Sequence, residues 1–262
     1  MIYTCYEMIR DCRAGLPQGW NYFLTQYVPA IRQFIAHYFP GRAADASLLD
    51  RVLLNFHQPE SPLFQSLEPG QERAFVAELR QRVLDAVEAD RAAAPPEIPF
   101  DIDALSAALE PLTLTEKQVV WFETMLYPAP DTGRMLRMSP ETAEKIRARA
   151  AELIRANVES WRTTILADNG PLLGRTARAI STKDCLPSKV FFDIIDGRAT
   201  WRDREEMERH VRTCWHCLDY HCRLLEVVHI LRASQPLPDS DVARYQSLLG
   251  IAPPQRSFWK RS

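Results

Sequence analysis

The sequence has few glycines, no long apolar run and almost no net charge. Its 262 residues include nine glycines but 19 prolines, and the prolines cluster between segments with helical periodicity. This distribution favours helical modules joined by stiff connectors, so the predicted fold class is all-α. No apolar stretch approaches the ~20 residues that span a bilayer, and the N-terminus lacks the pattern of a signal peptide. We therefore expect a cytoplasmic protein without membrane contact.

The sequence also lacks the motifs of common active sites. It contains no nucleophile motif, phosphate-binding loop or open metal site, so we expect neither an enzyme nor a small-molecule substrate. The net charge of −2 gives no support for a protein that binds only DNA. Among the six cysteines, Cys5 and Cys12 are expected to be buried small apolar residues.

Apolar residues recur at helical spacing through the first third of the chain. They predict a helix from about residue 18 that ends at Phe39-Pro40-Gly41, then helices at residues 46–56 and about 70–93. The side chains expected to face inward are Trp20, Phe23, Leu24, Tyr27, Ile31, Phe34, Ile35, Tyr38, Leu48, Leu49, Val52, Leu53, Phe56, Phe75, Leu79, Val83, Leu84 and Val87. Residues 1–93 thus form the first predicted domain, and the proline-rich residues 94–103 form a linker.

Residues 104–165 have the pattern of a helix-turn-helix. Thr115-Glu116-Lys117-Gln118 is expected to be a capping box that begins one helix. A short helix is expected from Asp131 to Arg137, with Gly133 at a tight position. Ser139 is then expected to cap a longer helix. The expected buried positions of that longer helix are Ala143, Ile146, Ala150, Leu153 and Trp161.

The longer helix carries the candidate DNA-binding residues. These are Thr142, Lys145, Arg147 and Arg149, on the helix that enters the major groove in such motifs. Residues 134–162 have a net charge of only +3, and Glu141 and Glu144 would lie close to phosphate. The alternative interpretation is a helical hairpin that only packs.

Four residues near the C-terminus have the spacing of a metal site, Cys185-x24-His210-x3-Cys214-x2-Cys217. The cysteine pair can chelate one ion, and a histidine four residues earlier lies on the same helical face. Three thiolates and one imidazole leave no position for substrate water, so we predict one structural zinc ion. His221 or Cys222 could replace Cys185 as the fourth ligand. The other interpretation is that these cysteines are buried small apolar residues.

The run DIIDGRATWRDREEMERHVRTCWHC resembles the zinc-binding anti-sigma domain. That pattern is a small helix, an Asp-Gly turn and then His-x3-Cys-x2-Cys, with a first ligand about where Cys185 stands. The resemblance implies a zinc-stabilised domain at residues 185–234 that binds a sigma factor. Residues 166–184 are then a linker, and residues 235–262 form a C-terminal tail.

The segment from Leu112 to Arg155 resembles region 4 of extracytoplasmic-function sigma factors, which reads the −35 promoter element. Residues 19–84 are similar to region 2 of the same family. The helix that docks on polymerase in that family carries Asp-Leu-Val-Gln-Glu-Val-Phe, whereas this chain has Ser47-Leu48-Leu49-Asp50-Arg51-Val52-Leu53. Glu78 stands where the family commonly has tryptophan.

The resemblances imply a fold of two sigma-like helical domains and a small zinc-binding domain. The implied function is transcription regulation, in which the zinc domain controls binding to RNA polymerase core and promoter DNA. The alternative is a degenerate sigma mimic that binds another regulatory protein and does not recognise promoters. The changes at Asp50, Arg51 and Glu78 favour this alternative.

Overall fold

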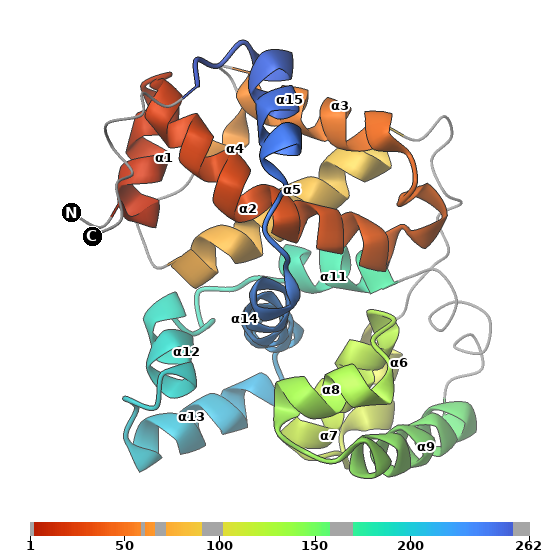
Figure 1. Cartoon of the computed structure of the whole chain (residues 1–262). Coiled ribbons are helices and arrows are strands. Elements are labelled where there is room, and N and C mark those ends of the chain that lie inside the picture. The colour runs from red at the N-terminus through yellow and green to blue at the C-terminus, as the bar shows by residue number, and fades with distance from the viewer. Residues whose placement is uncertain (1–2, 59–60, 66–71, 91–101, 158–169, 254–262) are drawn as a thin grey trace. The chain divides into compact units, whose positions relative to one another are not determined.

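The computed structural model describes residues 3–58, 61–65, 72–90, 102–157 and 170–253. Every regular element in these ranges is a helix, which confirms the all-α prediction. The chain divides into two compact units (Figure 1), of which the first comprises Met1–Ala94 and Ile230–Ser262 and the second Pro95–His229. No helix in the described ranges is both long enough and apolar enough to cross a membrane.

The first unit is built around a long central helix. Its elements are α1 (Cys5–Arg13), α2 (Pro17–Tyr38), the short 3-10 helix η1 (Pro40–Arg42), α3 (Ala46–His57), α4 (Pro62–Gln65), α5 (Glu72–Ala89) and α15 (Asp239–Leu249). Helix α2 contacts α1, α5 and α15. All the inward-facing side chains predicted for α2, α3 and α5 are buried. The helical periodicity therefore identified this core correctly.

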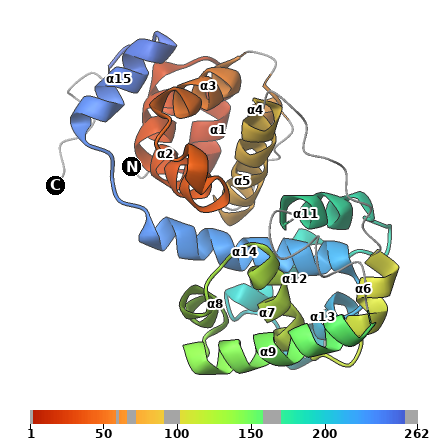
Figure 2. The same cartoon turned by 90° about the vertical axis from the view of Figure 1, so that its right-hand side faces the viewer.

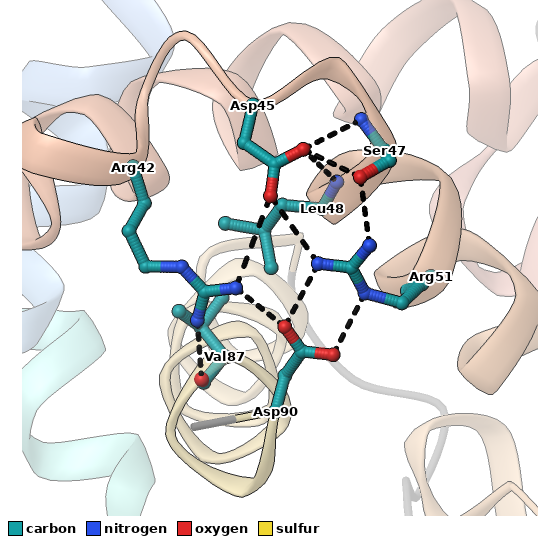
Figure 3. A network of polar contacts seen from close by, with 7 residues as sticks. All are labelled: Arg42, Asp45, Ser47, Leu48, Arg51, Val87 and Asp90. Atoms are coloured by element: carbon teal, nitrogen blue, oxygen red, sulfur yellow. Dashed lines mark hydrogen bonds and ion pairs between the residues drawn. The ribbon is translucent and has the colours of Figure 1, made fainter. Parts of the chain in front are cut away.

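A polar network ties the start of α3 to the end of α5 (Figure 3). The Asp45 carboxylate caps α3 by accepting hydrogen bonds from the backbone amides of Ser47 and Leu48, at 3.0 and 3.2 Å. Arg51 donates to Asp90 from Nε at 2.7 Å and from Nη2 at 2.9 Å. Hydrogen bonds from Arg51 and then Arg42 lower the pKa of Asp90 to about 2.

The second unit contains the predicted helix-turn-helix and the cysteine-rich segment. Its elements are α6 (Ile102–Leu109), α7 (Leu114–Thr124), α8 (Ala129–Leu136), α9 (Pro140–Asn157), α11 (Gly170–Ala179), α12 (Ser188–Ile195), α13 (Trp201–Val211) and α14 (Trp215–Ala233), whose last turn belongs to the first unit. Helix α9 contacts α6, α7 and α8.

The turn between α8 and α9 has the tight geometry that the sequence predicts. A Cβ atom on Gly133 would lie 2.7 Å from the backbone oxygen of Met138, so only glycine fits. Arg137 adopts a left-handed conformation, with φ of 58°, and ends α8. Ser139 then caps α9 by accepting a hydrogen bond from the Thr142 amide at 3.2 Å. Both the short helix and the predicted cap are confirmed.

Two local predictions in this segment were wrong. The residue that caps α7 is Thr113, because its side chain accepts from the Glu116 amide while the Glu116 carboxylate accepts from the Thr113 amide. Thr115 lies inside the helix instead. On α9 the buried residues are Ala143, Ala150 and Ile154, whereas the predicted Ile146 and Leu153 are only half-buried. Trp161, the last residue of the predicted stripe, lies outside the described residues.

The predicted linker at residues 166–184 and the predicted C-terminal tail at residues 235–262 both contain helices. Residues 166–184 include α11, which begins at Gly170-Pro171, and its Ala177 is fully buried. Residues 235–262 include α15, which packs on α2 and α3 in the first unit. Proline is favoured in the first turn of a helix, so Pro171 and Pro238 mark helix starts as well as chain breaks.

Candidate metal centre

The four predicted ligands lie in one turn, at the end of one helix and at the start of another. Cys185 follows a turn in which its amide donates to the Thr182 oxygen at 3.1 Å, just before α12. His210 lies in the last turn of α13. Cys214 directly precedes α14, and Cys217 lies in its first turn.

A tight turn between α12 and α13 allows the two helices to pack against each other. Gly197 has a φ of +75°, and the Arg198 amide donates to the Asp193 oxygen at 2.7 Å. Thr200 and Asp203 then form a capping box that begins α13. The Asp196-Gly197 turn is where the sequence predicts it. It folds the chain back so that the N-terminal end of α12 meets the C-terminal end of α13.

The ligand atoms of Cys185, His210, Cys214 and Cys217 lie within 4.8 Å of one another. The Cys185 and Cys214 Sγ atoms are 3.8 Å apart, and His210 Nε2 is 3.2 Å from Cys217 Sγ. A tetrahedral zinc site with Zn–S bonds of ~2.3 Å has sulfur–sulfur distances of ~3.8 Å. The cluster could therefore hold a metal ion, and its three thiols and one imidazole are compatible with zinc.

Backbone amides point at the sulfur atoms of the cluster. The Thr182 amide donates to Cys185 Sγ at 3.3 Å, and the Leu186 amide donates to Cys217. Burial alone would raise the pKa of Cys185, but the bonds from the Thr182 amide and hydroxyl lower it below its ordinary value. Burial raises the pKa of Cys217 to about 12 and also raises that of Cys214. A bound cation would offset this burial effect, because it favours the thiolate form.

The alternative fourth ligands lie elsewhere. His221 is buried against Gln118, whose Nε2 is 3.2 Å from His221 Nδ1, and burial lowers the pKa of His221 to about 4. Cys222 is fully buried, and its pKa is raised well above the ordinary value. The metal-ligating group includes Cys185 and neither of these two residues. His216, between the two cysteines, is half-buried with Nδ1 enclosed.

The segment between the metal ligands packs on α7, the helix that precedes the α8–α9 helix-turn-helix. Lys117 Nζ of α7 donates to the Arg212 backbone oxygen at 2.6 Å, between His210 and Cys214. The Trp121 and Trp215 rings lie 5.7 Å apart. The segments that we predicted as separate domains at 104–165 and 185–234 therefore share one compact unit.

The candidate DNA-binding residues lie together on α9, but two of them are already paired. Thr142, Lys145 and Arg149 are exposed. Arg149 Nη1 lies 2.5 Å from Glu116 Oε1, and Arg147 Nη2 lies 2.6 Å from Glu144 Oε1. The sequence did not predict the pair between Arg149 and Glu116, because it joins residues from two different helices.

No protein-family model, curated protein or solved structure matches this chain.

Proposed function

We propose that the chain binds one structural zinc ion and is a sigma-factor-like transcription regulator whose zinc site holds the helix-turn-helix in place. The observation that supports this proposal best is the packing of the cysteine–histidine cluster on α7. Four protein ligands fill a tetrahedral zinc site, so the metal supplies folding energy and takes no part in a reaction.

The ligands link metal binding to the position of α7. Arg212 lies between His210 and Cys214, and its backbone oxygen accepts the bond from Lys117. Trp215 directly follows Cys214, and its ring lies 5.7 Å from that of Trp121 at a tilt of 37°. Loss of zinc frees the ends of α13 and α14, so these contacts with α7 weaken.

The proposed targets are RNA polymerase core and promoter DNA. Exposed Thr142 and Lys145 can reach a DNA backbone directly. Arg147 and Arg149 must first break their ion pairs with carboxylates of this chain before they can bind a DNA phosphate. This exchange lowers the gain from each phosphate contact, so we expect weak promoter binding that depends strongly on salt.

The same ion pairs favour a second candidate function. A helix-turn-helix whose arginines are neutralised by carboxylates of the same chain suits a protein-interaction scaffold better than a promoter reader. In this version the chain binds another regulatory protein and has no promoter activity.

A pull-down with purified core polymerase distinguishes the two candidates. We would use the full-length tagged chain, because α15 completes the first unit and α11–α14 complete the second. About one zinc per chain and recovery of core polymerase are expected for the wild type. Cys214→Ser is expected to lose both zinc and most of the recovered polymerase.

The control is Cys5→Ser, a half-buried cysteine of the first unit, which should keep zinc and polymerase. Zinc-loaded chain that recovers no polymerase would refute the sigma-like function. Recovery of a different protein from a lysate by the same chain would then favour the scaffold.

A further inference from the structure

Helix α15 is far in sequence from the helices that it covers. It packs on α2 and α3 within the first unit, as both views show (Figures 1 and 2). Tyr245 is fully buried in this contact and Leu249 nearly so. Several further contacts are polar and directional, so the surface beneath α15 recognises a particular arrangement of side chains.

Three polar residues of α2 and α3 receive α15, and we call them the α15 seat: Asn21, Arg32 and Asp50. Arg244 donates two hydrogen bonds to the Asp50 carboxylate, at 2.8 and 2.9 Å. Arg32 donates to Asp241 at 2.7 Å and to the Tyr245 hydroxyl at 2.9 Å. Asn21 accepts a bond from Gln246 at 2.7 Å.

The two arginines also flank the buried aromatic ring. The guanidinium carbons of Arg244 and Arg32 lie 4.5 and 5.8 Å from the centre of the Tyr245 ring. Residues 241, 244 and 245 lie on one face of a helix because they are separated by three and four positions. The α15 seat therefore binds a helix that carries an acidic residue and, one turn later, an arginine followed by an aromatic residue.

The attachment of α15 has the character of a reversible contact. Its ion pairs are accessible to solvent, with 46% of the Arg244 side chain and 41% of the Arg32 side chain exposed. Such pairs contribute little to stability, so most of the attachment depends on Tyr245 and Leu249. The connection from α14, residues 234–238, has no helical structure and contains Pro236 and Pro238.

We infer that α15 is a releasable helix and that the α15 seat is a docking surface for a partner protein. The partner supplies an amphipathic helix with the chemistry of α15, an acid one turn before an arginine–aromatic pair. Because α15 is joined to the chain, its effective concentration at the seat is high, and a partner must displace it. This inference depends on the first unit alone and not on the proposed transcription role.

The test uses a fluorescent peptide of residues 235–253 and the full-length chain. Wild-type chain keeps its own α15 in the seat and should bind the peptide weakly. The double variant Arg244→Glu, Tyr245→Ala releases α15 and should bind the peptide at least tenfold more tightly, measured by fluorescence anisotropy. Ser247→Glu, an exposed position on the same helix, is the matched control and should behave like wild type.

Charge exchange at Asp50 tests the specificity of the seat. Adding Asp50→Arg to the released variant should weaken binding of the peptide several-fold, because the new arginine would face Arg244 of the peptide, and a peptide with Arg244→Asp should restore it. Equal binding to wild-type and released chains would overturn the inference. Peptide binding that ignores the charge at position 50 would also overturn it.

A second approach covers the case in which the double variant fails to fold. A protease site inserted within residues 234–238 leaves every contact of α15 in place. After cleavage, the C-terminal segment should separate from the chain on dilution in size-exclusion chromatography. A segment that stays bound at nanomolar concentration would show that α15 is a permanent part of the first unit.

Discussion

Cys185 is the proposed zinc ligand whose position depends most on tertiary structure. His210, Cys214 and Cys217 are close in sequence, and one helix end with one helix start brings them together. Cys185 reaches them only because the α12–α13 pair folds back at Gly197. Its sulfur nevertheless has the most favourable surroundings for a thiolate, since two groups of Thr182 donate to it.

Substituting Cys185 and Cys222 separately identifies the fourth ligand. Cys185→Ala should weaken zinc binding by more than the roughly 10- to 100-fold that follows loss of an outer-sphere partner. Cys222→Ala should leave the zinc affinity unchanged, because Cys222 lies outside the cluster. Competition with a chromogenic chelator measures both affinities. A larger loss of zinc affinity in Cys222→Ala than in Cys185→Ala would contradict the proposed ligand set.

His221 should make the second unit sensitive to acid. Its pKa is lowered to about 4 by burial, so the unfolded chain takes up the proton first as pH falls below ~6.5. The resulting loss of stability between pH ~6.5 and 4 is on the order of 3 kcal/mol. His221→Gln should remove this part of the pH dependence in urea unfolding of zinc-loaded protein. Identical pH profiles for the two proteins would show that folding does not lower the pKa of His221.

At the scale of elements, helix α3 is held by two charge pairs in its N-terminal half. Its N-terminal half is tied to the end of α5 through Arg51 and Asp90, and Asp50 in the same turn binds Arg244 of α15. Both pairs involve residues at which the sequence departs from the sigma-factor pattern. Asp50 and Arg51 therefore have structural partners within this chain.

The pair between Arg51 and Asp90 should contribute stability at neutral pH and lose it in acid. The pKa of Asp90 is lowered to about 2 when folded, against ~3.9 when unfolded. The contribution is therefore complete above pH ~4 and falls as the pH approaches 2. Asp90→Asn should destabilise the first unit at pH 7 and flatten its acid unfolding curve. Asp239→Asn, at an exposed acid near the start of α15, is the control and should preserve the curve.

Local signals explain which elements could be predicted from the sequence. Helices α2, α3 and α5 carry long apolar stripes, and the α8–α9 turn carries Gly133 and Ser139, so all four features were recognisable. Helices α11 and α15 were missed because each has a proline at its start, Pro171 or Pro238, that we interpreted as a chain break. The seat of α15 depends on pairs such as Arg244 with Asp50, which are separated by most of the chain and leave no local pattern.

At the scale of the whole molecule, the two units should respond differently to removal of zinc. The helices α12 and α13 bury few apolar side chains, among them Phe191, Phe192, Met207 and Val211. Small modules with so little core depend on their metal for folding. The first unit has its own aromatic core around α2 and has no share in the cysteine–histidine cluster.

Hydrogen exchange with and without a zinc chelator tests this difference. Chelation should accelerate exchange in α12, α13 and the start of α14, and to a lesser degree in α7, through loss of the Lys117 and Trp215 contacts. Exchange in α2, α3 and α5 should stay unchanged. Equal acceleration in both units would mean that they fold as a single cooperative system.

The division of the first unit into two chain segments has a consequence for biosynthesis. Helices α1 to α5 leave the ribosome early, whereas α15 follows only after residues 95–229 have been made. At ~5–20 residues per second, that interval lasts roughly 7 to 27 s. During this interval α15 does not yet cover the α15 seat, which consists of Asn21, Arg32 and Asp50. The nascent chain therefore presents this surface to chaperones and partners before the finished protein can close it.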